Sequence, residues 1–297
     1  MRAWRWPPSS STVSDLGASS RPTGYAVDMA LLALTGAAGR IATAVRPRLR
    51  AAGHRLVLCE GPGVPVADVD DDLERFVECD LRDIDAQAEA FAGADLVVHL
   101  GAHSDEQAWA DLLSVNIDGT RAVCEAARLA GVPRLLLASS VHAAGFVPVD
   151  SPALRQGMPL PAPDTYYGVS KAALEALGAL YAARFGMTVV SARIMTFADG
   201  TDRRSLRSWL SSDDMTRLVL AALTTEATGH HVVWGVSRNT RRHVDLSPGL
   251  AIGFDPQDDA ETYACAGGHL SAAPSSPFLG GGFTQPDYRL GEPHGGR

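Results

Sequence analysis

The sequence predicts an α/β protein with a doubly wound parallel sheet and a small C-terminal helical lobe. Short apolar runs alternate with amphipathic segments along residues 31 to 194, and this alternation is typical of strands and helices in a parallel sheet. The first apolar run ends in a glycine-rich turn. A later run, from Arg134 to Ala138, is continuously apolar, as expected of a central strand that is covered on both faces.

The composition indicates one large domain, or one domain with a small lobe. A chain of 297 residues, of which 46% are hydrophobic, can bury a sizeable core. A formal net charge of −8 argues against a surface for nucleic acid or anionic membrane, because either needs a dominant basic face. The cysteines lack the spacing of metal ligands, so we predict no metal site and expect reduced thiols in a cytoplasmic protein. They are Cys59, Cys79, Cys124 and Cys265.

The N-terminal stretch has no apolar segment of signal-peptide length. We interpret residues 1–28 as a disordered leader and Met29 as an alternative start of translation. Residues 29–195 are expected to form a nucleotide-binding domain that carries the catalytic residues. Residues 196–284 are expected to form a substrate-binding lobe that includes a strand at 231–234, followed by a flexible tail at 285–297.

The first strand, Leu31 to Thr35, leads through a glycine turn into a helix that ends at about Ala52. Gly36 permits the tight turn, and Gly39 lets backbone N–H groups approach a pyrophosphate. The small side chain of Ala42 suits close packing of the helix on the strand. This strand, turn and helix predict a dinucleotide-binding site.

The second predicted strand, Arg55 to Cys59, places Glu60 at its C-terminal end, 24 residues after Gly36. A carboxylate at this place accepts hydrogen bonds from the adenosine ribose and repels a 2′-phosphate, so NAD is expected in preference to NADP. Arg40 leaves the alternative open, because an arginine just past the glycine turn could pair with that phosphate.

The third and fourth strands are predicted at residues 75–79 and 96–101. Asp80 and Leu81 follow the third strand and are expected to frame the adenine. His99 and His103 are interpreted as structural. Asn116 lies in a predicted helix that runs to residue 130, where its amide is expected to bridge strand ends beneath the cofactor.

The central strand delivers polar residues to the sheet edge at which open α/β sheets bind ligands. They are Ser139, Ser140 and His142, with Val141 among them. A proline-rich loop at 148–163 follows and is interpreted as a lid or rim of the substrate site.

Tyr167 and Lys171 are four residues apart, and Lys171 is the only lysine of the chain. On a helix both side chains share one face, so both can reach one reacting group. A tyrosine acts as a base near neutral pH only if its pKa falls by roughly 3 units from about 10. A neighbouring ammonium and a cationic nicotinamide ring favour that change. The alternative is a solvated helical pair.

The remainder of the chain is predicted to contain a strand at 188–194, a mostly helical segment at 205–227 and a strand at 231–234. His230 and His231 are adjacent and cannot share a helical face, so they are not expected to bind metal.

Together these motifs resemble those of the extended short-chain dehydrogenase/reductase superfamily, also called the NAD-dependent epimerase/dehydratase family. The resemblance covers roughly Leu31 to Val236 and implies a Rossmann fold, an NAD cofactor and catalysis by Tyr167, Lys171 and Ser140. The implied cofactor-binding residues are Gly36, Ala38, Gly39, Arg40, Ile41, Glu60, Asp80, Leu81, Leu100, Gly101, Ala102, Asn116, Tyr167 and Lys171.

Finer matches resemble the members of that family that oxidise uronic acids. They are the segments at 209–214 and 232–237 and Gly281-Gly282-Phe283. This resemblance implies oxidation of a hexuronic acid such as D-glucuronate or D-galacturonate at its anomeric carbon, giving an aldaro-lactone. Arg204 would hold the carboxylate, with Arg203 and Arg207 as competitors for that role. The implied substrate-binding residues are Ser104, Ser140, Val141, His142, Thr196 and Arg204.

Three residues depart from the pattern of those members. Val141 replaces an asparagine, and losing its hydrogen bond costs on the order of 1 to 3 kcal/mol if a sugar hydroxyl stays unpaired. Thr196 replaces a serine, and Met195 replaces a glycine, so a narrower pocket is expected. The reaction type is therefore better specified than the substrate.

Two other functions stay open: a nucleotide-sugar epimerase or dehydratase of the same superfamily, and a non-catalytic NAD sensor. The superfamily often forms subunit contacts through the helices that flank the tyrosine helix, so the resemblance also implies a homo-oligomer. No nucleic-acid or membrane partner is expected.

Overall fold

The computed structural model describes residues 29–198, 206–264 and 276–293. The predicted leader at 1–28 and the candidate arginines Arg203 and Arg204 therefore lie outside the described residues, as does Cys265. Among the described residues, no helix combines the length and the apolar character that a membrane crossing requires.

A seven-stranded parallel sheet in the order β3-β2-β1-β4-β5-β6-β9 forms the centre of the fold. This order confirms the predicted doubly wound sheet, because the chain moves outward in one direction from β1 and then in the other. The strands are β1 (Leu31–Thr35), β2 (Arg55–Glu60), β3 (Glu74–Glu78), β4 (Leu96–His99), β5 (Arg134–Ser140), β6 (Thr188–Ile194) and β9 (His230–Gly235).

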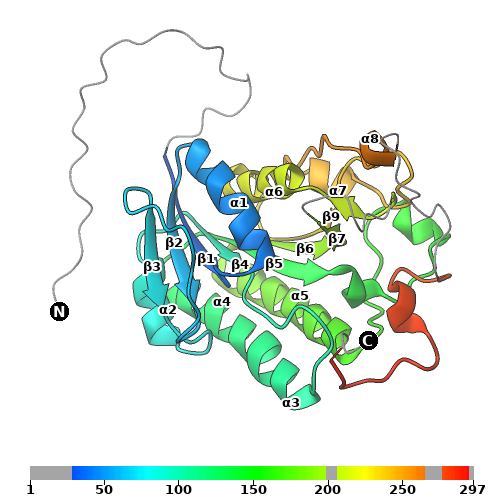
Figure 1. Ribbon diagram of the computed structural model, residues 1–297, viewed down its shortest axis with the longest axis horizontal. Coiled ribbons are helices and arrows are strands. Elements are labelled where there is room, and N and C mark those ends of the chain that lie inside the picture. The colour runs from blue at the N-terminus through cyan, green and yellow to red at the C-terminus, as the bar shows by residue number, and fades with distance from the viewer. Residues whose placement is uncertain (1–28, 199–205, 265–275, 294–297) are drawn as a thin grey trace, which may run out of the picture.

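Helices cover both faces of the sheet (Figure 1). One face carries α1 (Arg40–Ala51) and α6 (Ser212–Thr224), and the other carries α2 (Ile84–Phe91), α4 (Gly119–Leu129) and α5 (Tyr166–Phe185). Because successive strand residues point to opposite faces, Leu32 and Leu34 pack in one buried cluster while Ala33 packs in the other. The continuous apolar strands of the sequence are thus explained by a sheet that is buried on both sides.

The expectation that the strand at 231–234 belongs to a separate lobe is wrong. β9 pairs in parallel with β6 along the main sheet, for example Ala192 with Val233. The helix predicted within 205–227 is α6, and it packs on α1 over the same sheet. Val233 of β9 and the apolar side of α6 are buried in the same cluster on this face of the sheet, and that burial stabilises both elements there.

Short elements surround the sheet's C-terminal edge. They comprise the small sheet of β7 (Thr196–Phe197) and β8 (Trp209–Leu210), the π-helix η1 (Leu112–Asp118) after α3 (Trp109–Asp111), the 3-10 turns η2 (Val141–Ala144), η3 (Pro152–Leu154) and η4 (Gly281–Thr284), and the helices α7 (Ser247–Leu250) and α8 (Glu261–Ala264).

The C-terminal segment at 276–293 returns to the sheet edge and lies beside the loop that follows β5 (Figure 1). Leu279 N donates to Val147 O at 3.0 Å, and Gly280 N donates to Gly145 O at 2.9 Å. Residues far apart in the sequence therefore close one side of this edge.

Candidate active site

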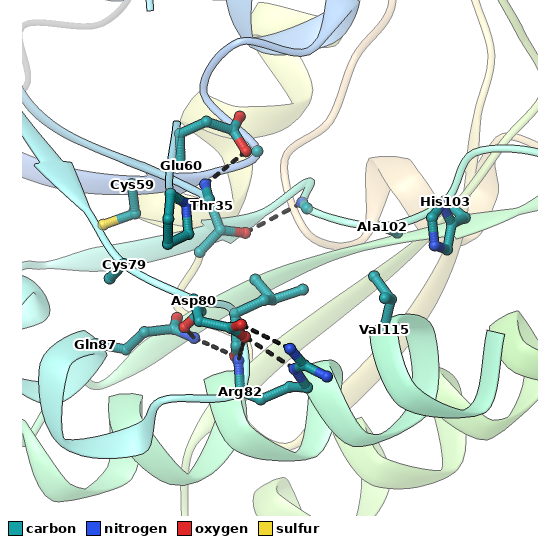
Figure 2. Close-up of a pocket in the computed structure, with 15 residues that line it drawn as sticks. Thr35, Cys59, Glu60, Cys79, Asp80, Arg82, Gln87, Ala102, His103 and Val115 are labelled. Atoms are coloured by element: carbon teal, nitrogen blue, oxygen red, sulfur yellow. Dashed lines mark hydrogen bonds and ion pairs between the residues drawn. The ribbon is translucent and has the colours of Figure 1, made fainter. Parts of the chain in front are cut away.

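The glycine turn after β1 forms one wall of a cleft of about 260 Å³ (Figure 2). Gly36 has φ +67°, and a Cβ built on it would lie 2.7 Å from the Cα of Gly101. Only glycine permits both this conformation and this close approach of two backbones. The predicted fourth strand ends at His99 rather than residue 101, because the chain turns there to pass Gly36.

The N-terminus of α1 follows the glycine turn directly and carries no capping side chain. Gly39 is the N-cap, no side chain of the described residues makes a capping bond there, and the first turn contains no acidic residue. Free N–H groups and the positive end of a helix dipole are the features that bind a pyrophosphate. The turn at Gly36 to Gly39 therefore has the form that the sequence predicts for a dinucleotide site.

Glu60 ends β2 and bonds to the glycine turn. Its Oε2 accepts from Ala38 N at 2.9 Å and its Oε1 from Gly61 N at 2.9 Å. These bonds fix the carboxylate at the mouth of the cleft, while further lone pairs stay available for ribose hydroxyls. Figure 2 shows Glu60 across the cleft from Asp80.

The far end of the cleft is lined by Asp80, Leu81 and Arg82. Arg82 donates to both carboxylate oxygens of Asp80, and these bonds lower the pKa of Asp80 to about 2. Gly101 and Ala102 line the same cleft. Cys59 and Cys79 are buried there as free thiols.

Arg40 is not part of the lining of the cleft that contains Glu60. It lines a second cavity, of about 180 Å³, together with Ile41 and Leu100. An arginine that binds a 2′-phosphate must stand beside the ribose at the end of β2. The geometry thus gives no support to the alternative in which Arg40 selects NADP.

The second cavity contains Tyr167 and Lys171 at the C-terminal edge of β5. Both side chains lie on the first turns of α5, and Lys171 Nζ lies 5.5 Å from the centre of the Tyr167 ring. Ser140, the last residue of β5, forms a hydrogen bond with Tyr167. Among the residues that the structure describes, the three predicted catalytic side chains therefore meet in one cavity.

Burial controls the protonation of this pair. It raises the pKa of Tyr167 to about 12, against the opposing effect of the Ser140 hydrogen bond. Burial also lowers the pKa of Lys171 to about 8, and Nζ donates to Ala138 O at 2.8 Å. The expectation that the ammonium makes the phenol acidic is therefore not met by the protein's own groups, because desolvation outweighs their attraction.

Two buried polar side chains fix the start of α5. Asn116, on the π-helix η1, donates to His103 O and to Ser170 Oγ, each at 3.0 Å. Glu106 is fully buried and accepts from Tyr167 N at 2.7 Å and from Gly291 N at 2.8 Å. A carboxylate at a helix N-terminus is favourable, so Glu106 both caps α5 and attaches the C-terminal segment to it.

His142 lines the second cavity and is hydrogen-bonded to a buried carboxylate. Its Nδ1 lies 2.7 Å from Asp164 Oδ2, and the Asp164 side chain is fully buried. The imidazole also contacts the rings of Tyr167 and Phe283, at centroid distances of 5.7 and 4.3 Å. Asp164 fixes the orientation of the imidazole beside the phenol.

Only some of the other residues that the resemblance singles out lie in the second cavity. Ser104, Val141 and Met195 line the second cavity. Thr196 does not, and its hydroxyl lies 2.8 Å from Ser208 Oγ. Arg207 lies near His243, outside this cavity.

His99 is structural, as predicted. It is buried between Thr35 and Thr120, and burial lowers its pKa to about 3.

Sequence reasoning missed Glu106, Asp164 and Phe283 as parts of the site. Asp164 stands three residues before Tyr167, and an acid so close to the catalytic helix was a usable signal. Glu106 carries no local signal, because its neighbours in space are distant in the sequence. Phe283 belongs to the match at Gly281-Gly282-Phe283, which marked the segment without giving this side chain a role.

The chain matches the model of the NAD dependent epimerase/dehydratase family over residues 32–198. It is 36% identical to a uronate dehydrogenase of Pseudomonas putida, over 85% of this chain and 95% of that protein. It is 34% identical to an L-arabinose 1-dehydrogenase (NAD(P)(+)) of Haloferax volcanii, over 79% of this chain and 99% of that protein.

Solved structures show the same fold. A mutant uronate dehydrogenase of Agrobacterium tumefaciens in complex with NAD superimposes with a TM-score of 0.75 at 33% identity. The superposition covers 86% of this chain and 97% of that one.

Proposed function

Because the chain belongs to the NAD-dependent epimerase/dehydratase family, we propose that it is an NAD-dependent dehydrogenase that oxidises the anomeric carbon of a hexuronic acid. The observation that carries the proposal is the meeting of Tyr167, Lys171 and Ser140 in one cavity beside a dinucleotide cleft. Similarity to uronate dehydrogenases over most of the chain supports the substrate class. D-Galacturonate and D-glucuronate are the proposed substrates, and an aldaro-lactone is the product.

The first cleft fits NAD. The N-terminus of α1 receives the pyrophosphate, and Glu60 receives the adenosine ribose hydroxyls and disfavours a 2′-phosphate. Asp80 and Leu81 border the adenine end of the cleft. NAD, when bound, accepts the hydride and brings a positively charged ring to the edge of the sheet.

Tyr167 acts as the base in this proposal. Its phenolate oxygen accepts the proton of the C1 hydroxyl, and Ser140 donates a hydrogen bond to the same sugar oxygen. Burial raises the pKa of Tyr167 to about 12, so phenolate formation requires positive charge in the cavity. Lys171 supplies part of that charge and orients the nicotinamide ribose.

The substrate occupies the second cavity. Ser104 and His142 face it as hydrogen-bonding groups, and Val141 and Met195 make one wall apolar. Arg204 is proposed to pair with the carboxylate, because a planar guanidinium binds a carboxylate in a bidentate manner. Thr196 is proposed as a further contact that needs to release Ser208 first.

A substrate panel tests this function. The purified full chain should reduce NAD with D-galacturonate or D-glucuronate. Its activity should be far lower with galactose or glucose as the substrate, and far lower when NADP replaces NAD. Tyr167→Phe should abolish turnover and still bind NAD. Activity on a nucleotide sugar without net NADH production would identify an epimerase or dehydratase instead, and NAD binding without any turnover in the wild type would identify a sensor.

We also propose that the protein is a homo-oligomer. An apolar groove between η1 and α5 contains Leu113 and Leu180, which are 45% and 51% exposed. Large exposed apolar side chains gathered in one groove indicate a contact surface. A second copy of α5 fits this groove, since the same helix would then bury its own leucines in return.

A further inference from the structure

A third cavity, of about 320 Å³, lies between the loop that contains η3 and the loop that follows β9. It shares no residue with the cofactor cleft or with the cavity of Tyr167. The proposed reaction uses none of its side chains. We call it the Arg155 pocket; its lining residues are Arg155, Thr240, Arg242, His243, Val244, Asp245 and Leu246.

Basic side chains gather around this pocket. Arg155, Arg242 and His243 line it, and Arg207 lies near enough to act on His243. The pKa of His243 is lowered first by burial and then by the positive charges of Arg207 and Arg155. The chain as a whole has a formal net charge of −8. This cluster is therefore a basic region on a protein whose net charge is negative.

The nearby carboxylates are already engaged. Asp245 lines the pocket but accepts from both the N–H and the hydroxyl of Ser247. Asp259 accepts from Thr240 N and Thr240 Oγ1. Within the described part of the chain, Arg155 and Arg242 form no ion pair. Arg242 Nη1 donates to the backbone oxygen of Asn239, and its charge acts on Asp259 without a direct bond. Guanidinium donors that are bonded to no carboxylate are available to a ligand.

Neighbouring arginines on the same loop differ in this respect. Arg238 is paired with Asp255, and Arg241 is paired with Glu261. Neither lines the pocket. The loop thus directs two arginines to acidic partners and one, Arg242, to the cavity.

The walls of the pocket are held in place. Asp245 N donates to Leu154 O at 2.7 Å, which ties the two loops together. Leu154, Val244 and Leu246 are buried in one apolar cluster beneath the pocket. Val141 and Met195, which line the substrate cavity, pack against the same cluster. The backbone that carries the basic groups is therefore held in place, and its support is continuous with a wall of the substrate site.

We propose that the Arg155 pocket binds an anionic group, a phosphate or a carboxylate, through Arg155 and Arg242. Guanidinium groups match these oxygens with paired hydrogen bonds, and the cluster lacks such a partner within the described residues. The group has two possible sources. It is either the second acidic group of an extended substrate, such as a uronic acid disaccharide, or a free anion that acts as an effector.

Binding of inorganic phosphate tests the pocket independently of the reaction. Thermal unfolding and calorimetric titration are measured at constant ionic strength, with sodium chloride replacing phosphate in the reference. We expect phosphate to stabilise the wild type, and the double variant Arg155→Gln/Arg242→Gln to bind it about tenfold more weakly or worse. The matched control Arg238→Gln/Arg241→Gln removes two charges from the same region and should bind within about twofold of the wild type.

Two results would overturn the proposal. One is a wild type whose unfolding and calorimetry respond to phosphate no more than to chloride. The other is an equal loss of binding in both double variants, which indicates only a diffuse charge effect. If the double variant does not fold, the single variant Arg155→Gln replaces it, because that side chain is exposed at the surface.

Kinetics then distinguish the two sources, and this second step alone rests on the proposed function. If the anion belongs to the substrate, Arg155→Gln/Arg242→Gln raises KM for a digalacturonate and leaves KM for D-galacturonate unchanged. If it is an effector, phosphate changes the rate with D-galacturonate in the wild type and in the control but not in that variant.

Discussion

Replacing Lys171 with methionine should stabilise the protein while abolishing its activity. Lys171 is 4% exposed, and burial lowers the pKa of its ammonium from 10.5 to about 8. A difference of roughly 2.5 units at about 1.4 kcal/mol each corresponds to a cost of between about 3 and 4 kcal/mol for keeping the charge buried at neutral pH. Methionine has a similar length without the charge, so it removes this cost.

Part of that gain is lost again. Nζ donates to Ala138 O at 2.8 Å, and methionine leaves this carbonyl without that donor. An unmade hydrogen bond of this kind costs about 1 kcal/mol. The net expectation is therefore a gain of between about 2 and 3 kcal/mol in the free energy of unfolding at pH 7, measured by urea denaturation.

The pH dependence of the stability tests whether the Lys171 ammonium destabilises the fold. Below about pH 8 the ammonium is charged in both the folded and the unfolded chain, so the full cost is present. Between about pH 8 and 10.5 the unfolded chain binds more protons than the folded one, so the wild type gains stability with rising pH. The advantage of Lys171→Met should shrink over this window. A variant that is less stable than the wild type at pH 7, or an advantage that grows toward pH 9.5, would refute the reasoning.

Three further outcomes are expected. Asp164→Asn should raise KM for the uronate about tenfold or more, because the buried carboxylate that orients His142 is lost, and the effect should vanish in a His142→Ala background. Steady-state kinetics with and without His142 test this. An equal rise of KM in both backgrounds would show that Asp164 does not act through His142. Glu60→Gln should lower the preference for NAD over NADP at least about tenfold, in the ratio of kcat/KM values, because the repelling charge is removed. An unchanged preference for NAD over NADP would show that Glu60 does not select the cofactor. Leu113→Glu/Leu180→Glu should dissociate the oligomer, as measured by light scattering, because two charges cannot be buried in an apolar contact. A monomeric wild type would contradict the proposed contact.

The candidate active site gives up stability at Lys171, where an ammonium that is charged at neutral pH is desolvated, whereas the neutral phenol of Tyr167 carries no such cost. The desolvated ammonium of Lys171 and the buried phenol of Tyr167 each disfavour the charged form that the proposed reaction uses. Such perturbed groups in one cavity are typical of catalytic sites. Neighbouring buried bonds compensate, above all those of Asn116 and Glu106, which hold the start of α5 in place.

Features that depend on neighbours along the chain could be predicted from the sequence. The turn at Gly36, the carboxylate at the end of β2 and the four-residue spacing of Tyr167 and Lys171 are local patterns, so strand ends and helix faces could be predicted from them. These patterns also place their residues at one edge of the sheet, because all strands of a parallel sheet end there.

The tertiary structure alone decided what depends on long-range packing. It brought β9 into the main sheet, placed Glu106 on the helix of Tyr167, and set Arg155 beside Arg242 across 87 positions of sequence. It also set the burial that raises the pKa of Tyr167 to about 12 in the protein alone, because the degree of burial is a property of the packed fold. Apolar burial selects these contacts without regard to distance along the chain, so no local pattern encodes them.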